Sequence, residues 1–196
     1  MQKALPVLLF SLALCAGFAD SQEQPDLEAM FKYAKPGKHH AELGKFIGKW
    51  DVETTLIMPG GKEPVTTKGG SAEYSWLFEG RWLQGRLKSS FMGMPYEQFS
   101  IMGFDNYRQN WTTVVVSNFD TAMRMVTGVP VDPKGKVRAQ YGTLDEPSMR
   151  QTDKAYKVVT KIANDDKFHM EIWDLGIGEA GMKVMQFSLT RQKDTE

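Results

Sequence analysis

The sequence predicts an all-β protein, an antiparallel up-and-down β-barrel of about ten strands with a short N-terminal helix. From Gly48 almost to the end of the 196-residue chain, apolar and polar residues alternate with a period of two. This period is typical of strands with one buried and one solvated face. Clusters of Gly, Pro, Asn and Asp separate the alternating runs at short intervals, which indicates hairpin turns and hence a meander.

The first residues have the order of a secretory signal peptide. Lys3 precedes an apolar stretch from Ala4 to Phe18, and small residues stand before Asp20, so we expect residues 1–19 to be removed. The stretch is shorter than the roughly 20 residues of a transmembrane helix, so no transmembrane span is expected. Residues 20–37 follow as a leader, helical or mobile, and the barrel domain covers residues 38–192. These features predict a secreted or periplasmic protein.

Composition narrows the classes of partner and cofactor. The only cysteine, Cys15, lies in the predicted signal peptide, and the bulky Leu14 before it argues against lipidation. Without the signal peptide the net charge is about −1, so no electrostatic attraction to nucleic acid is expected. The chain has no phosphate loop, dinucleotide fingerprint, zinc helix or nucleophile elbow, so we expect no cofactor and no metal. No oligomeric state is favoured.

A short helix precedes the first strand. His40, Leu43, Phe46 and Ile47 share one helical face, which we expect to cover one end of the barrel. The predicted strands then follow in order at residues 50–58, 72–78, 81–91, 96–104, 107–116, 122–129, 136–143, 154–162, 167–175 and 182–191. Ten twisted strands curl, and closure removes exposed edges, so a barrel is favoured over an open sheet. A two-sheet sandwich remains the alternative.

Two sets of residues resemble known families. Gly48 and Trp50 open the first strand and Arg191 ends the last, which resembles the lipocalin or calycin arrangement; there, the late Arg packs on the indole and closes the barrel floor. A longer set resembles the bacterial lipocalin-like family DUF1579, a domain of unknown function. This set consists of His40, Leu43, Gly48, Trp50, residues 80–83, residues 92–96, residues 103–105, Tyr107 and Arg191.

The DUF1579 resemblance covers roughly residues 38–191. It implies a small β-barrel, often exported, with no settled activity. Many relatives carry an aspartate and serine pair after the fifth strand, whereas residues 118–121 here read Asn, Phe, Asp, Thr. A role for that pair therefore does not carry over to this chain.

The favoured function is binding of a small hydrophobic or amphipathic molecule inside the barrel, without bond making. Arg86 and Arg124 would anchor a carboxylate if they turned inward, although the alternation favours an outward Arg86. The many methionines suit either a loosely selective cavity or an ordinary core. The expected ligand contacts are Trp76, Phe78, Phe99, Met102, Trp111, Arg124, Met170 and Phe187.

Two other function classes stay open. One is an enzyme on the same barrel, in which the pair His169 and Glu171, or a buried Asp105, transfers protons. Alternation favours an outward His169, because Phe168 and Met170 form the more apolar set. The other class is a structural protein with a filled core. The adjacent His39 and His40 point in different directions on a helix, so they are poorly placed to bind one metal ion together. His40 is instead expected to cap or pack at the mouth of the barrel.

Overall fold

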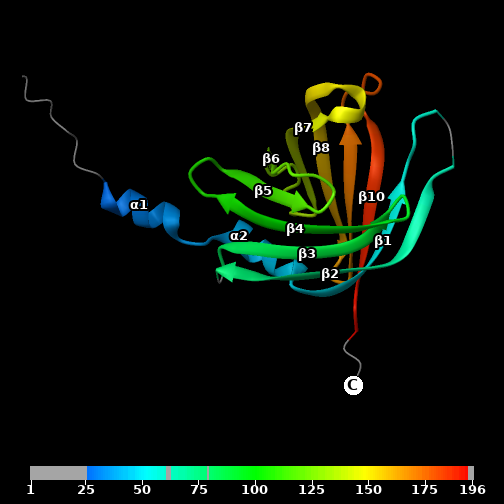
Figure 1. Cartoon of the computed structure of the whole chain (residues 1–196). Coiled ribbons are helices and arrows are strands. Elements are labelled where there is room, and N and C mark those ends of the chain that lie inside the picture. Colours follow the sequence, from blue (N-terminus) through cyan, green and yellow to red (C-terminus); the bar gives the residue numbers. More distant parts are fainter. Residues whose placement is uncertain (1–25, 61–62, 79, 194–196) are drawn as a thin grey trace, which may run out of the picture.

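A computed structural model describes residues 26–193 except 61, 62 and 79, and it is a closed antiparallel barrel (Figure 1). Each strand pairs with its neighbours in sequence, and the first strand pairs with the last, which confirms the predicted up-and-down barrel. The predicted signal peptide lies outside the described residues. The elements are α1 (Leu27–Ala34), α2 (Lys38–Leu43), η1 (Gly44–Phe46), β1 (Gly48–Leu56), β2 (Val65–Phe78), β3 (Trp82–Phe91), β4 (Met94–Asp105), β5 (Asn110–Ser117), β6 (Arg124–Gly128), β7 (Val137–Glu146), η2 (Pro147–Met149), β8 (Gln151–Asn164), β9 (Lys167–Asp174) and β10 (Met182–Arg191).

All ten predicted strands are present, and three of their starts, those of β2, β5 and β8, differ from the prediction by three residues or more, β8 beginning at Gln151 rather than at residue 154. β2 begins at Val65 rather than at residue 72, because residues 65–71 are mostly Thr, Lys and Gly and show no apolar alternation. β5 begins at Asn110 rather than at residue 107. Asp105 Oδ1 accepts the backbone N–H groups of Tyr107 and Arg108 at 2.8 and 2.9 Å, so these residues form a turn.

One end of the barrel is closed by α2 and η1. Leu43 and Phe46 of these helices are 0 and 3 % exposed, and they pack against Trp50 at the start of β1. Trp50 Nε1 donates to the Phe46 carbonyl at 2.8 Å. The apolar helical face therefore covers the barrel floor, as the sequence predicts.

Arg191 joins the last strand to the same, helix-covered end of the barrel. Its guanidinium lies 4.2 Å from the centre of a Trp50 ring, which confirms the predicted cation–π contact. Nη1 and Nη2 also donate to the carbonyls of Ile47 and Lys45, at 2.7 and 2.8 Å. Gly48 has a φ of +121°, and a Cβ there would lie 2.8 Å from Arg191 Nη1, so glycine is required by both conformation and space.

α1 projects away from the barrel, and none of its residues is buried (Figure 1). Its end is joined to the barrel through the β4–β5 turn. Tyr33 packs edge-on against Tyr107 at 5.1 Å, and Asn106 Nδ2 donates to the carbonyls of Tyr33 and Lys35. The predicted leader thus contains a helix at Leu27–Ala34. Across the described part of the chain, no helix has both the length and the apolar character needed to cross a membrane.

Candidate functional site

The interior of the barrel has a filled half and an accessible half. Beside the helices, Phe168 and Leu189 are 2 and 1 % exposed within an aromatic core. Further along these strands and on β8, the inward-facing partners Val158, Ile172 and Met185 are only half-buried, although Phe187 and Tyr156 beside them are 3 and 7 % exposed. A side chain that faces inward in a closed barrel meets solvent only from inside or through the mouth. We call the half away from α2, around these residues, the accessible half.

Three polar side chains from different strands face the accessible half. Arg124 opens β6, Tyr96 lies near the start of β4 and Tyr156 lies on β8. Burial raises the pKa of both tyrosines, and the positive charge of Arg124 opposes this rise at each of them, so the three groups share one electrostatic environment. Arg124 is paired with Asp120 of the preceding loop. The accessible half therefore combines one cation with two neutral hydroxyl groups.

The structure places the residues expected to contact a ligand in several different parts of the barrel. Arg124, Met170 and Phe187 face the accessible half, where Phe187 stacks with Tyr96 at 6.3 Å. Met102 faces inward deeper in the barrel. Two tryptophans, Trp76 and Trp111, belong to the aromatic packing of the filled half.

Two expected inner contacts are on the outside, so this part of the prediction is wrong. Phe78 ends β2 and is 61 % exposed, because a register shift after Trp76 breaks the alternation there. Phe99 lies on the outer face of β4, since its neighbour Ser100 is the buried, inward residue. The guanidinium of Arg86 lies 5.2 Å from the Phe99 ring. Arg86 is thus outward as well and is no anchor for an interior carboxylate.

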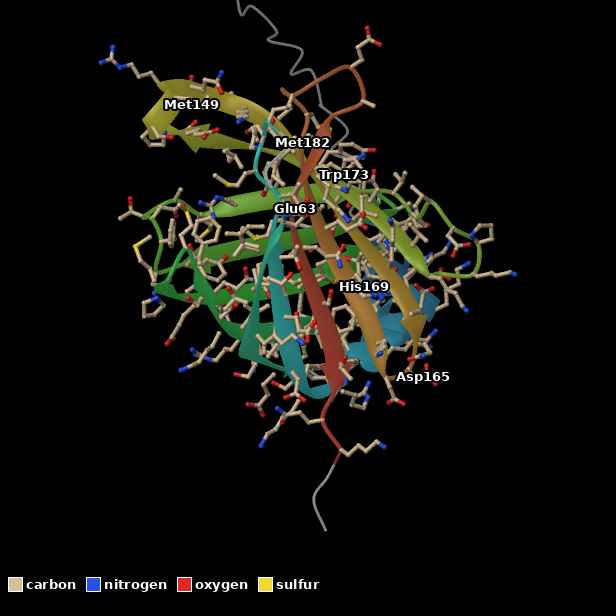
Figure 2. All side chains as sticks on the ribbon, turned by 90° about the vertical axis from the view of Figure 1, so that its right-hand side faces the viewer. Glu63, Met149, Asp165, His169, Trp173 and Met182 are labelled. Carbon is tan, nitrogen blue, oxygen red and sulfur yellow. The ribbon has the colours of Figure 1, made fainter. Side chains whose placement is uncertain are left out.

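His169 and Trp173 lie on the outer face of β9 (Figure 2), and Glu171, between them in the same phase of the strand, shares that face and is shielded to 6 % exposure. Glu171 accepts hydrogen bonds from Lys161 Nζ at 2.9 Å and Trp173 Nε1 at 3.1 Å, and Lys183 Nζ lies 3.6 Å away. His169 Nδ1 instead lies 3.1 Å from Ser188 Oγ. The two residues are not brought together as a proton-transfer pair.

The environment of Glu171 favours its charged form. Burial raises the pKa of this carboxyl, but the hydrogen bonds from Lys161 and Trp173 and the charges of Lys161 and Lys183 outweigh burial and leave the pKa lowered. A carboxylate held in its anionic form on an outer face is a structural partner for lysines. Asp105, the other residue considered for proton transfer, caps the β4–β5 turn.

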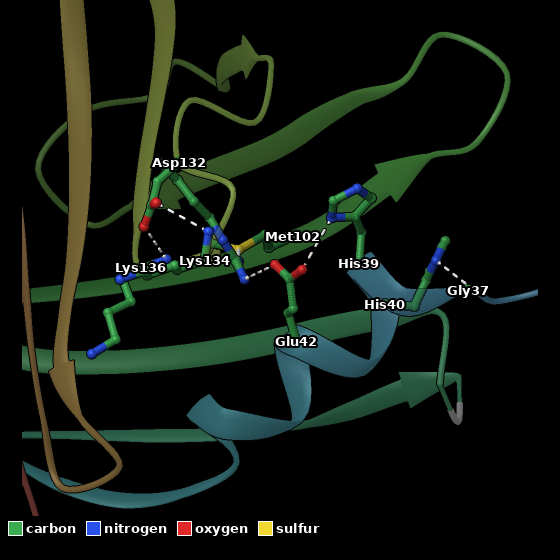
Figure 3. A network of polar contacts seen from close by, with 9 residues as sticks. Gly37, His39, His40, Glu42, Met102, Asp132, Lys134 and Lys136 are labelled. Carbon is green, nitrogen blue, oxygen red and sulfur yellow. Dashed lines mark hydrogen bonds and ion pairs between the residues drawn. The ribbon is translucent and has the colours of Figure 1, made fainter.

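No sequence pattern predicts the polar cluster that lies under α2 (Figure 3). Arg138 of β7 is 2 % exposed, and its guanidinium lies 3.8 and 5.2 Å from the rings of Trp111 and Phe46. Its Nη2 lies 3.3 Å from Glu42 Oε2, and the other oxygen of Glu42 lies 3.2 Å from His39 Nδ1. Arg138 was missed because the apolar Val137, Ala139 and Tyr141 alternate with Arg138 and Gln140, a pattern that predicts an outward Arg138.

Arg138 is incompletely paired. Burial lowers the pKa of its guanidinium to about 10, although Glu42 opposes this shift. Its Nε is buried and has no hydrogen-bond partner. The cluster borders a pocket of about 330 Å³ between α2 and the β6–β7 connection. It is lined by Lys38, His39, Glu42, Trp111, residues 130–133, Gly135, Val137 and Arg138.

Two further sequence-based expectations concern histidine and methionine. His40 is 6 % exposed and its Nδ1 lies 3.2 Å from the Gly37 backbone nitrogen at the start of α2, so it both packs and caps. Within residues 26–193, apart from the gaps, no group of three or more His, Cys, Asp or Glu side chains is placed to hold a metal. Most barrel methionines fill neither core nor cavity, because five are surface residues: Met92, Met94, Met123, Met125 and Met149.

Comparisons with known proteins agree with the barrel. The crystal structure of Rv2717c from M. tuberculosis matches with a TM-score of 0.55 and 12 % identity, over 81 % of this chain and 100 % of that one. At this identity the likeness shows the fold alone. A redesigned β-barrel matches with a TM-score of 0.38 and 11 % identity, over 78 % of this chain and 96 % of its own. No curated protein matches the sequence.

The family assignment is decided by the sequence itself. The model of the family described as "Protein of unknown function (DUF1579)" matches residues 35–191, from the loop before α2 to the last residue of β10. The match includes the whole barrel, the closing helices and Arg191. The chain therefore belongs to the DUF1579 family.

Proposed function

We propose that this protein binds a small amphipathic molecule in the accessible half of its barrel. The supporting observation is the partial exposure of inward-facing apolar side chains in the middle of the strands, at Val158, Met170 and Ile172. Phe168, of the same phase on β9 but beside the helices, is only 2 % exposed. Concave sites lined by apolar side chains with a few polar groups are the usual form of small-molecule sites.

Arg124 sets the expected chemistry of the ligand. Its side chain is 25 % exposed and its only partner among the described residues is Asp120, a loop residue that is itself 32 % exposed. A ligand carboxylate competes with Asp120 for the guanidinium and accepts a hydrogen bond from Tyr156. For the hydroxyl of Tyr96 it competes with Gln98 Oε1, to which that hydroxyl donates at 2.7 Å. The apolar tail then lies against Met170 and Phe187. Binding and release involve no bond making.

A fluorescent fatty acid, 11-(dansylamino)undecanoate, tests the proposal. We expect saturable binding with a blue-shifted emission, because the accessible half excludes most water from the probe. Replacing Arg124→Met should raise Kd by about 10–100-fold, the equivalent of one hydrogen bond to a charged group. The matched control Arg86→Met removes the same charge from the outer face and should leave Kd unchanged.

Two variants sharpen the test. Asp120→Asn removes the competitor of the ligand and should lower Kd severalfold. Met170→Trp fills the accessible half and should abolish binding while the far-UV circular dichroism of the barrel is retained. Equal affinity in Arg124→Met and Arg86→Met, or unchanged binding in Met170→Trp, would place the probe elsewhere and refute the proposal.

We also propose that the protein is exported, on the basis of the apolar stretch at residues 4–18 and the small residues before Asp20. N-terminal sequencing of protein recovered from the periplasm or medium of its own host tests this. A mature chain that begins at Asp20 supports export, and an intact Met1 in the cytoplasm contradicts it. The carrier proposal does not depend on the outcome.

A further inference from the structure

The pocket under α2 is separate from the accessible half of the barrel. It lies between α2 and residues 130–138, at the end of the barrel that the helices close. Trp111 and Phe46, which are 1 and 3 % exposed, belong to the packed core between the two places. A ligand that enters this pocket therefore uses a different entrance and different contacts from one bound at Arg124.

The pocket lining sets two cations, Lys38 and Arg138, against two carboxylates, Glu42 and Asp132, whose oxygens already have partners. Asp132 is already occupied, since its Oδ1 and Oδ2 accept the backbone N–H groups of Lys134 and Lys136 at 3.0 and 2.8 Å. Glu42 is shared between His39 and Arg138 (Figure 3). In contrast, Lys38 makes no ion pair within residues 26–193, gaps aside. Arg138 keeps one buried N–H without an acceptor.

A buried donor without an acceptor is uncommon in folded proteins and points to a missing partner. Arg138 cannot turn away to find one, because Trp111 and Phe46 hold the guanidinium from two sides and Met102 Sδ contacts Nη1 at 3.7 Å. Arg138 is 2 % exposed and lines the pocket, so the pocket is the place from which an acceptor can approach. A planar carboxylate matches a guanidinium in geometry and charge.

The apolar lining residues of the pocket indicate what the rest of such a ligand is, beyond its carboxylate. Trp111 borders the pocket on the barrel side but is 1 % exposed, with the Arg138 guanidinium 3.8 Å from its ring centre. The apolar surface open to a ligand is that of Pro130, Val131 and Pro133 on the β6–β7 connection. This apolar surface suits a flat ring. The volume of about 330 Å³ is at the lower end of small-molecule sites, which limits the ligand to about one ring.

We infer that this pocket is a second binding site, for a small aromatic carboxylate. The carboxylate lies among Lys38, His39 and Arg138, and the ring lies against Pro130 and Pro133 of the β6–β7 connection. Glu42 holds His39 and Arg138 in place from the side of α2. Gly135 keeps room for this arrangement, because a Cβ there would lie 2.9 Å from Glu42 Oε2.

Benzoate is the probe for this site, measured by titration of ¹H–¹⁵N spectra of the full mature protein. We expect saturable shifts at residues 38–42 and 130–138, with Lys38→Ala raising Kd at least threefold. Lys134→Ala is the matched control, because it removes the same charge from the same connection without touching the pocket lining. Arg124→Met should leave benzoate binding here unchanged, which separates this site from the accessible half.

Three outcomes overturn the inference. Benzyl alcohol binding as tightly as benzoate would show that the donors are not used. Phenyl phosphate binding more tightly than benzoate would show that the site selects a phosphate ester. Shifts that are absent, or confined to the accessible half, would leave Arg138 as a purely structural residue. His39→Gln, on α2, is a second variant. It should weaken benzoate binding without changing the melting temperature of the protein by more than a few degrees.

Discussion

Single residues at the closed end carry much of the stability of this barrel. Arg191 contacts the Trp50 ring and also donates hydrogen bonds to the carbonyls of Lys45 and Ile47 around the end of η1, so one side chain joins the last strand, the first strand and the helices. The resemblance to lipocalins predicts the cation–π contact. It does not predict the two carbonyl contacts, which arise because η1 ends directly over the guanidinium.

Replacing Arg191→Met should lower the free energy of unfolding by about 2–4 kcal/mol, since it removes a cation–π contact and charged hydrogen bonds together. Urea unfolding followed by tryptophan fluorescence measures the change. Arg108→Met, at an exposed position in the β4–β5 turn, is the control and should change stability by less than about 0.5 kcal/mol. Equal effects of the two variants would contradict the role assigned to Arg191.

At the scale of elements, the two N-terminal helices have different roles. α2 buries Leu43 completely against the barrel floor, whereas Leu27 of α1 is 58 % exposed on a helix that projects from the barrel. Leu43→Ala should destabilise the protein by about 2–5 kcal/mol because it leaves a cavity in the core. Leu27→Ala should cost less than about 0.5 kcal/mol. Thermal unfolding of the two variants tests this contrast.

The outer face of β8, β9 and β10 carries a pH-dependent contribution. The folded-state pKa of Glu171 lies below its ordinary value near 4.5, so its contribution to stability is present above that pH and is lost as the pH falls through the folded-state pKa. Glu171→Gln should therefore be less stable than the wild type by about 1–3 kcal/mol at pH 7. The difference should shrink below pH 4.5. A constant difference between pH 3 and pH 7 would contradict this account.

The order and number of strands follow from the sequence because alternation and turn residues are local signals. Which residues of the expected site lie inside depends on longer-range facts. The register shift after Trp76 exposes Phe78, and Phe99 occupies the outer phase of β4 although it is apolar. The buried Arg138 is unpredictable for a related reason, since its burial results from α2 crossing the barrel end and supplying Glu42.

The whole molecule is a barrel with unequal ends. Helices, a tryptophan and an arginine fill one end, while the other leaves inward apolar side chains half-buried around Arg124 and two tyrosines. Barrels of this size can hold one small ligand in their interior, which is the basis of the proposed function. The proposed function therefore depends on whether that interior admits a ligand.

Methyl NMR of the methionines tests this claim most directly. Met170 and Met185 face the accessible half, whereas Met123 and Met149 are 72 and 63 % exposed on the surface. In protein labelled with ¹³C at the methionine methyl groups and titrated with dodecanoate, we predict saturable shifts at Met170 and Met185 and none at Met123 and Met149. Shifts at the surface methionines alone, or no shifts at any methionine, would contradict the account.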